Sequence, residues 1–192
     1  MSNIDRLNTK LIPLSWLYGF AVGVRNELFN LKILKSKQFK EPVIGIGNIT
    51  VGGTGKTPHV EYLVELLKES CKLAVLSRGY KRKTKGFVLA DANTGIDSIG
   101  DEAFQVKQKY PNITVAVDEK RVDGIKHLLA LEVDAKPDVI LLDDCYQHRY
   151  VKPGISILLV DYHHMLSDDH LLPAGRLREP ASNRDRADGI II

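Results

Sequence analysis

Beyond residue 41 the chain alternates short apolar runs with longer segments in which apolar residues recur at helical spacing. The apolar runs are bounded by turn-forming residues, which is typical of buried strands. The predicted strands are residues 42–47, 73–76, 113–117, 139–142 and 155–160, and the predicted helices are residues 56–70, 101–110 and 119–131. This alternation predicts an α/β fold with a mostly parallel sheet and helices on both of its faces.

The N-terminal part of the chain follows a different pattern. Apolar residues between positions 11 and 34 fall mostly at helical spacings, and Pro13 suits a first helical turn. Trp16 and Tyr18 lie in this stretch, and residues 1–40 contain seven Lys or Arg against two Asp or Glu. One interpretation is an amphipathic helix lying on an anionic membrane surface through residues 11–35. The other is a helix packed on the core, because basic residues favour any helix C-terminus.

Composition excludes several classes of protein. The formal net charge is +3 and the basic residues form no long run, so nothing indicates binding to nucleic acid. Cys71 and Cys145 lack metal-ligand spacing and suit a reducing compartment. The uncharged apolar stretch at residues 11–24 is shorter than the roughly 20 residues of a membrane-spanning helix, and no small-residue cleavage site follows it.

The strongest chemical feature is a glycine-rich loop between the first predicted strand and the first predicted helix after it. Backbone N–H groups in such a loop point at phosphate oxygens, and the helix N-terminus adds partial positive charge. Lys56 is placed to reach the β- and γ-phosphates, and the Thr57 hydroxyl to bind Mg²⁺. The strict motif would have glycine at Thr50. The predicted nucleotide-binding residues of the loop are Asn48, Gly52, Gly53, Thr54, Gly55, Lys56 and Thr57.

A phosphate loop of this kind needs a carboxylate near the metal. Asp143 and Asp144 directly follow the apolar run 139–142, which reads as a core strand ending at the edge where open α/β sheets bind ligands. An apolar run followed by acids is by itself common at a strand end. Together with the loop upstream, it predicts the Mg²⁺ side of an ATP site.

Four segments in order resemble the tetraacyldisaccharide 4'-kinase (lipid A 4'-kinase) family. Residues 143–149, Asp-Asp-Cys-Tyr-Gln-His-Arg, are similar to the family block Asp-Asp-Gly-Phe-Gln-His-Arg. The other three segments are the phosphate loop at 47–58, Ser-Arg-Gly-Tyr at 77–80, and Leu-Leu-Pro-Ala-Gly-Arg-Leu-Arg-Glu-Pro at 171–180. Cys145 and Tyr146 depart from the Gly-Phe of the block, which affects the local backbone and leaves the acids in place.

The resemblance implies a kinase that works at the cytoplasmic face of the bacterial inner membrane. It implies transfer of the γ-phosphate of ATP, with Mg²⁺, to the 4'-hydroxyl of a tetraacyldisaccharide 1-phosphate, giving lipid IVA. Residues 1–40 then form the membrane-associated helix and residues 41–192 the P-loop kinase core. The implied partners are the acylated disaccharide lipid and the membrane surface, with no nucleic acid and no obligate protein partner.

The resemblance also assigns roles to single residues. Asp101 matches the general base, with Glu102 beside it, and Arg178 and Glu179 match a pair near the nucleotide and the metal. The full set is catalytic Asp101, Glu102, Lys56 and His148; metal-side Thr57, Asp143, Asp144 and Glu179; nucleotide-side Arg178; and substrate-side Tyr80 and Arg121. From the residues alone, Asp101 and Glu102 are equally first-turn acids of a helix, and His148 a satisfied polar residue at a strand end.

Three further interpretations stay open from the residues. A GTP-dependent switch or an ATP-driven metallochaperone can carry a similar loop, although this chain has Val51 where the chaperone-like group has its signature lysine, and no Asn-Lys-x-Asp or Thr-Lys-x-Asp sequence. An inert membrane-surface module is the third. The apolar run at 189–192 looks like the opening of another strand, so we expect the natural protein to continue with the C-terminal portion of the family.

Overall fold

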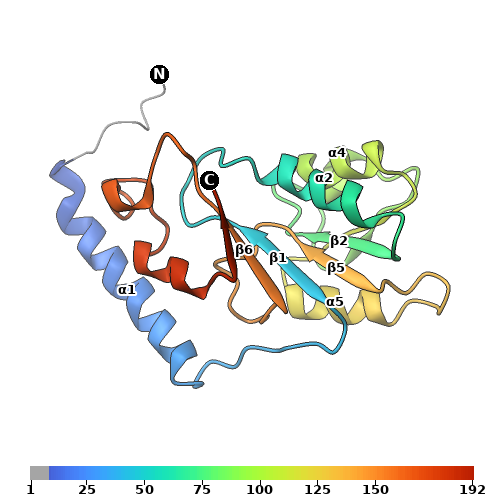
Figure 1. Cartoon of the computed structure of the whole chain (residues 1–192), viewed down its shortest axis with the longest axis horizontal. Coiled ribbons are helices and arrows are strands. Elements are labelled where there is room, and N and C mark those ends of the chain that lie inside the picture. The colour runs from blue at the N-terminus through green and yellow to red at the C-terminus, as the bar shows by residue number, and fades with distance from the viewer. Residues whose placement is uncertain (1–8) are drawn as a thin grey trace.

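The computed structural model describes residues 9–192 (Figure 1). The helices, with η for 3-10 helices, and the strands are, in chain order, η1 (Thr9–Leu11), α1 (Ile12–Asn30), β1 (Val43–Gly47), α2 (Lys56–Leu67), β2 (Leu73–Ser77), β3 (Val88–Leu89), α3 (Ile96–Ile99), α4 (Asp101–Lys109), β4 (Thr114–Val117), α5 (Arg121–Leu129), β5 (Val139–Leu142), β6 (Ile155–Leu159), η2 (Leu166–Asp168), η3 (Ala181–Arg186) and β7 (Gly189–Ile191).

The sheet has seven strands in the order β3-β4-β2-β5-β1-β6-β7. Each neighbouring pair is parallel except β3 with β4. The register aligns the ends of the central strands, since Leu76 lies opposite Leu142 and Gly47 opposite Leu158. The carboxyl ends of β1, β2, β4 and β5 therefore meet at one edge. The predicted α/β class, with its mostly parallel sheet, is confirmed.

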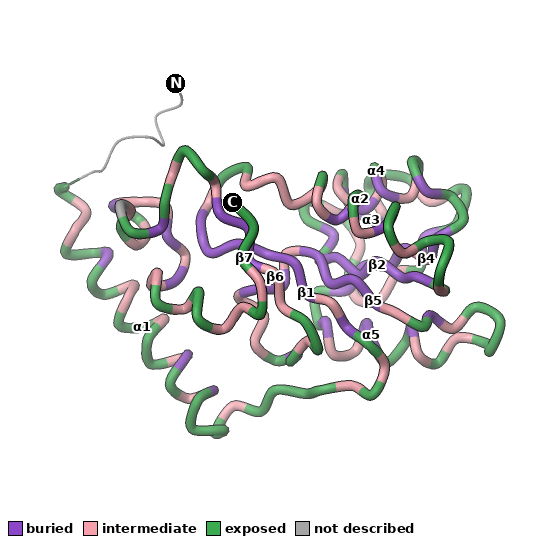
Figure 2. Tube along the Cα trace, viewed as in Figure 1, coloured by how far each residue is buried: buried purple, intermediate pink, exposed green. Residues whose placement is uncertain are grey.

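Helices cover both faces of the sheet, with α2 and α4 on one side and α5 on the other (Figure 1). One core joins Val64 of α2 and Val106 of α4 to Val75 of β2, and the other joins Leu128 of α5 to Leu76 of β2. Successive residues of a strand point to opposite faces, so β2 contributes to both cores and is buried throughout. Figure 2 shows this burial concentrated along the central strands.

Helix α1 lies beside the segment that carries η2 and η3, at the end of the sheet away from α4 (Figure 1). It ends at Asn30, before the predicted residue 34, and Lys32 just beyond adopts a left-handed backbone conformation with φ of 60°. Residues 1–8, which belong to the predicted 1–40 segment and include Asp5 and Arg6, lie outside the described residues. Within residues 9–192, no helix has the length and apolar character needed to cross a membrane.

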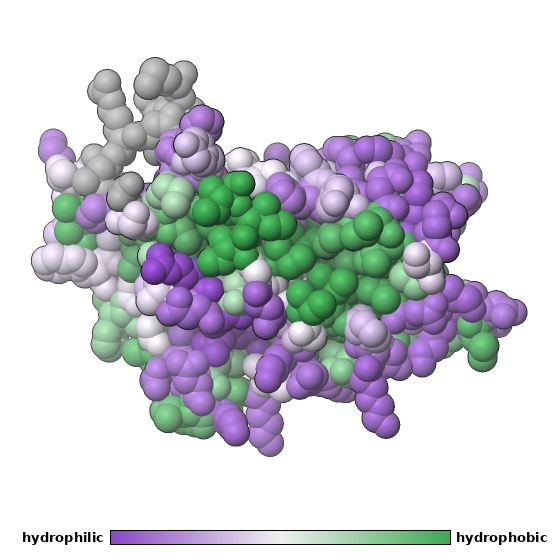
Figure 3. All heavy atoms as spheres, viewed as in Figure 1, coloured by the Kyte–Doolittle hydropathy of each residue, from purple (hydrophilic) through white to green (hydrophobic). Residues whose placement is uncertain are grey.

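The two faces of α1 have an unusual distribution of residue types. The side toward the protein buries Ser15, Asn26 and Phe29. The outer side leaves Trp16 74% and Phe20 71% exposed, together with other exposed apolar residues, Leu14, Leu17 and Val24. Figure 3 shows hydrophobic surface along part of α1 as well as near the middle of the viewed face, where β7 lies. The apolar side of this helix therefore points away from the core.

Candidate active site

The glycine-rich loop connects the end of β1 to the start of α2 at the carboxyl edge of the sheet. Gly52 and Gly55 adopt positive φ angles of 115° and 75°, which side chains disfavour. A Cβ placed on Gly52 or Gly53 meets no atom within 4 Å, so the space over the loop is open. Backbone curvature and open space together are what a bound phosphate chain requires.

The buried side chain of Asn48 holds the loop through contacts with Thr54 and Lys56. It is fully buried, and its Nδ2 donates to the Thr54 hydroxyl at 2.7 Å, while its Oδ1 lies 3.5 Å from the Lys56 ammonium nitrogen. Gln147 donates from its side chain to the Asn48 carbonyl oxygen. Asn48, predicted to bind the nucleotide, is placed where it orients Lys56, while Thr57 follows Lys56 in the first turn of α2.

Asp144 lies between two cations. Its Oδ1 is 3.7 Å from the Lys56 ammonium, and its Oδ2 is 3.6 Å from the Arg178 guanidinium. The residue adopts a positive φ of 46°, an uncommon conformation for Asp that turns its carboxylate toward the loop. Residues that are distant in sequence thus form one row, Lys56–Asp144–Arg178, at the loop.

Asp143 is buried just behind this row. Burial, and then the charges of the neighbouring Glu102 and Asp144, raise the pKa of its carboxyl from 3.8 to about 7. Burial also raises the pKa of Glu102, against the lowering effect of Lys56. Carboxylates that lie this close together favour a bound cation, because its positive charge offsets the free-energy cost of burying their negative charges.

Two observations test whether a magnesium ion fits here. Buried oxygens of Asp143, Asp144 and Glu179 have no hydrogen-bond partner among the described residues. No group of three or more His, Cys, Asp or Glu within residues 9–192 is arranged to hold a metal by itself. Mg²⁺ in nucleotide sites is usually held by one or two carboxylates plus phosphates, so the donor set fits an ion that arrives with ATP.

Asp101 begins α4 at the same edge, with an exposed side chain, directly after Gly100. Gly100 has φ of 82°, and a Cβ there would collide with the carbonyl oxygen of Tyr80. The close approach places the Tyr80 backbone against the start of α4, and Tyr80 as a whole residue is 62% exposed. The predicted base and the predicted substrate contact thus lie on adjoining segments.

Arg121 lies deeper than a substrate contact would require, and His148, whose catalytic role stays a prediction, is half-buried. Arg121 is 1% exposed, and its guanidinium donates to the carbonyl oxygens of Asp118 at 2.6 Å and Asp143 at 3.0 Å. Burial, and then the charge of Arg121, lower the pKa of His148, whose Nδ1 has no hydrogen-bond partner among the described residues. In the structure Arg121 supports the Asp143 backbone, and its contact with substrate stays a prediction.

Residues 171–178, here called the strap, cross the start of the phosphate loop. Arg178 donates its N–H to the Ile49 carbonyl at 2.7 Å, and Val51 donates to the Arg176 carbonyl at 2.8 Å. Thr50, which replaces the expected glycine, is buried and forms an antiparallel bridge with Leu177. The departure from the strict motif therefore lies where the loop pairs with another segment, a pairing that spacing along the chain does not reveal.

Glu179 continues from the strap and is buried. Its carboxylate pairs with Arg186 and accepts from Asn183 Nδ2 at 2.8 Å, and the Arg186 guanidinium lies over the Tyr146 ring at 4.6 Å. Arg186, Asn183 and Tyr146 were not among the predicted site residues, although Tyr146 lies within the family-like block 143–149 and the other two follow the segment 171–180. A role of Glu179 at the metal stays a prediction.

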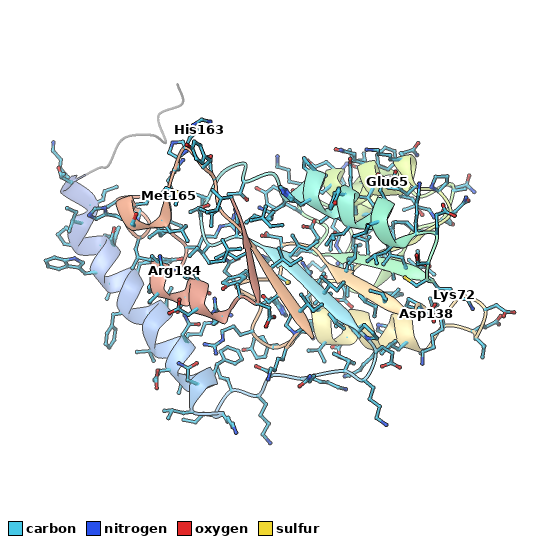
Figure 4. The ribbon with its side chains drawn as sticks, in the orientation of Figure 1. Glu65, Lys72, Asp138, His163, Met165 and Arg184 are labelled. Carbon is cyan, nitrogen blue, oxygen red and sulfur yellow. The ribbon has the colours of Figure 1, made fainter. Side chains whose placement is uncertain are left out.

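The opposite edge of the sheet, where strands begin, holds a hollow of about 830 Å³ lined by residues that include Lys72 and Asp138. Figure 4 shows these two side chains at the start of β2 and β5, and the Lys72 backbone N–H donates to the Asp138 carboxylate at 2.8 Å. Open α/β sheets bind ligands at the carboxyl ends of their strands. The candidate active site is therefore the loop edge.

Comparisons with known proteins agree with this geometry. A tetraacyldisaccharide 4'-kinase of Phocaeicola vulgatus is 56% identical over 190 residues, which cover 99% of this chain and 52% of that protein. One of Flavobacterium johnsoniae is 53% identical over 189 residues, with coverages of 98% and 55%. A crystal structure of LpxK from Aquifex aeolicus in complex with ATP has a TM-score of 0.86 and 38% identity, and covers 95% of this chain and 57% of that one.

The chain spans about half the length of the curated relatives it matches. A family model described as tetraacyldisaccharide-1-P 4'-kinase matches residues 7–192, and this range contains the phosphate loop, the acids after β5 and the strap. This chain therefore belongs to the tetraacyldisaccharide-1-P 4'-kinase family.

Proposed function

We propose that the full-length protein transfers the γ-phosphate of ATP to the 4'-hydroxyl of a tetraacyldisaccharide 1-phosphate, giving lipid IVA. The observation that carries the proposal is the row Lys56–Asp144–Arg178 beside an open phosphate loop, in a chain of this kinase family. The ATP-bound crystal structure of the Aquifex aeolicus relative supports ATP as the phosphate donor. GTPase and metallochaperone functions have no comparable support.

In the proposed reaction, backbone N–H groups of residues 52–57 bind the phosphate chain and Lys56 binds its terminal phosphates. Arg178, 3.6 Å from Asp144, is close enough to move onto the transferring phosphoryl group. Asp101 accepts the proton of the 4'-hydroxyl while that oxygen bonds to the γ-phosphorus and ADP leaves. Mg²⁺, when bound, neutralises charge on the β- and γ-phosphates, and we propose that it is held by Thr57, Asp143, Asp144 and Glu179.

An acylated acceptor must be taken from a membrane, and the outer face of α1 supports such a location. Its exposed Trp16 and Phe20 are aromatic residues of the kind that lie in the headgroup region. The exposed cations Lys10 and Lys32 lie just before and just after this helix, which suits anionic lipid. We therefore place the protein as a peripheral enzyme at the cytoplasmic face of the bacterial inner membrane.

Transfer to the lipid acceptor tests the function directly. Full-length protein, Mg-ATP labelled at the γ-phosphate and the disaccharide lipid should yield a labelled 4'-phosphate. Lys56→Ala and Asp101→Ala should each lower the rate by about 100-fold or more, since phosphate stabilisation and proton transfer each contribute at least that much. Lys68→Ala and Asp97→Ala, which remove exposed charges on or near α2 and on α3, are matched controls. A near-normal rate for Asp101→Ala would remove it from the mechanism.

A further inference from the structure

The inner face of α1 is joined to the strap by side chains one helical turn apart. The Tyr18 hydroxyl donates to the Arg178 carbonyl oxygen at 2.8 Å. The Ser15 hydroxyl accepts from the Ala174 N–H at 3.0 Å. Residues three apart on a helix share one face, so both hydrogen bonds come from the same side of α1.

The neighbouring Gly19 allows the helix to approach closely. A Cβ at this position would lie 2.6 Å from Leu171 Cδ1, at the start of the strap. The helix thus contacts the strap near both of its ends, through Gly19 at Leu171 and through Tyr18 at Arg178. This contact brings the proposed membrane helix directly against a segment of the nucleotide site.

Arg178 is held on three sides by different parts of the protein. Its N–H donates to the Ile49 carbonyl in the segment leading to the phosphate loop, and its carbonyl accepts from Tyr18 of α1. Its guanidinium lies 3.6 Å from the Asp144 carboxylate. Because the backbone on both sides of its Cα is fixed, the direction in which the long side chain leaves the strap is fixed as well.

The state of the Tyr18 hydroxyl suits this role. Burial and then the nearby Glu179 raise the pKa of Tyr18 above 10.0, so the hydroxyl keeps its proton at neutral pH and remains a donor. The Arg178 carbonyl oxygen is its acceptor. Tyr18→Phe keeps the aromatic ring and removes only this hydrogen bond.

We propose that Tyr18 is a positioning residue that orients Arg178 toward the triphosphate, so that the membrane-facing helix takes part in binding the nucleotide. The proposal rests on the proposed function in one respect, since it takes Arg178 to contact the phosphates of ATP. It predicts that loss of a single hydroxyl on α1 weakens nucleotide binding without affecting the attachment of the helix to lipid.

Tyr18→Phe in the full-length protein is the primary test, with calorimetric titration of Mg-ATP as the measurement. Loss of one net hydrogen bond corresponds to a dissociation constant about three- to tenfold higher. In transfer assays the KM for ATP should rise by a similar factor while kcat at saturating ATP stays within about twofold. Tyr62→Phe removes the hydroxyl of an exposed tyrosine on α2 and serves as the matched control.

A double-mutant cycle separates positioning from a general effect on folding. If Tyr18 acts through Arg178, Tyr18→Phe should change the dissociation constant by less than about 1.5-fold once Arg178 is already alanine. The same fold-change in both backgrounds would overturn the proposal. An unchanged dissociation constant for Tyr18→Phe alone would overturn it too. Near-ultraviolet circular dichroism of each variant confirms that the compared proteins are folded.

The outcome can be separated from that of the proposed function. Binding of Mg-ATP is measured without the lipid acceptor. A protein that binds ATP but does not phosphorylate the disaccharide would refute the proposed function, and the effect of Tyr18→Phe on ATP binding could still be measured on it. Sedimentation of Tyr18→Phe with anionic vesicles should equal that of the wild type, because the exposed outer face of α1 is intact. Release from vesicles would instead show that Tyr18 acts by seating the helix on lipid, and would overturn the proposal.

Discussion

At the scale of single residues, ionisation of the buried Asp143 carboxyl lowers the stability of the fold. Its carboxyl is buried beside Glu102 and Asp144, and its pKa rises to about 7. Folding therefore favours the protonated form of Asp143. A group with a raised pKa in the folded state stabilises the protein at low pH, and this contribution is lost as the pH rises through the folded-state pKa.

Asp143→Asn should remove this dependence on pH. In metal-free buffer the variant is expected to unfold at the same denaturant concentration as the wild type near pH 4. Near pH 8 it should be more stable, by on the order of 1–3 kcal/mol, because it buries no ionised carboxylate. Urea titrations across this range measure the difference, with Asp97→Asn on the protein surface as the control. A difference that does not grow with pH would contradict the raised pKa.

Gly100 provides a second test at the residue scale. Gly100→Ala must accommodate a Cβ against the Tyr80 carbonyl at φ of 82°, so we expect a loss of about 1–3 kcal/mol in stability and lower transfer through displacement of Asp101. Gly95→Ala is the matched control, because Gly95 directly precedes α3 at φ of −82° and a Cβ there meets nothing within 4 Å. Equal thermal unfolding of the two variants would rule out the steric argument.

Single positions also show what the sequence could and could not predict about the site. Lys56 and the acids after β5 were predictable, because a loop between strand and helix and a strand end fix their places. The ion pair of Arg178 with Asp144 joins residues more than 30 positions apart, and the position of Thr50 depends on pairing with Leu177. Such long-range contacts leave no periodic signal in the chain.

At the scale of elements, α1 buries the polar residues Ser15 and Asn26 and exposes most of its large apolar residues. The burial pattern favours the interfacial interpretation of this helix over a helix whose apolar face packs on the core, since Ser15 and Asn26 are buried while Trp16 and Phe20 are exposed. Periodicity predicted the helix but not which side faces the protein. A helix with apolar residues on much of its circumference gives no such direction. The direction comes from contacts with the strap and with Gln147 and Arg149, which are distant in sequence.

Trp16→Ser with Phe20→Ser should release the full-length protein from anionic vesicles. Both side chains are exposed, so folding should change little, while roughly 300 Å² or more of apolar surface is lost for insertion, at about 25 cal/mol per Å². We expect at least a tenfold decrease in the vesicle-bound to free ratio in a sedimentation assay.

The matched control for this prediction is Tyr62→Ser with Leu66→Ser, which removes two exposed apolar residues from α2. Vesicle binding that decreases equally in the control, or persists in the α1 variant, would contradict a membrane role specific to α1. Deletion of residues 1–35 would be a cruder test, because it also removes the contacts of α1 with the core.

Among the other elements, the apolar strands and the periodic helices were predicted from the sequence, whereas β3 and α3 were not. The five internal strands and the three helices of the core appear near their predicted positions, and the run at 189–192 forms β7. Strand β3 has two residues and α3 has four, which is too short to show a period. Their positions follow from pairing with β4 and from contact with α4, which are tertiary effects.

At the scale of the whole molecule, the carboxyl edge of the sheet gathers the phosphate loop, the acids after β5, the start of α4 and the strap. Strand order brings this about, because β5 lies between β1 and β2 although it follows both in the chain. The site thus joins residues from most of the described chain. A ligand that binds across these segments should stabilise the fold as a unit.

Mg-ATP should therefore raise the thermal unfolding midpoint of the protein, and Mg-GTP should raise it less. A ligand at about 100 times its dissociation constant adds about 2.7 kcal/mol of stability, which corresponds to a shift of several degrees. Differential scanning fluorimetry measures this, and Lys56→Ala should abolish the ATP shift. A larger shift with GTP would favour the GTPase alternative.

The way in which α1 is attached has one more consequence. Two of its side chains, Tyr18 and Arg25, donate to main-chain oxygens, those of Arg178 at 2.8 Å and Gln147 at 2.7 Å. Every residue type offers such an oxygen, so the acceptor positions can drift in evolution while the two donors are retained. Arg149 adds side-chain contacts, because its guanidinium donates to Asn26 Oδ1 at 3.3 Å and to Asn30 Oδ1 at 2.8 Å. An N-terminal helix grafted from a distant relative should therefore dock in the same way if it keeps the two donors and these two asparagines, and the proposed membrane contact could then be exchanged between relatives as a module.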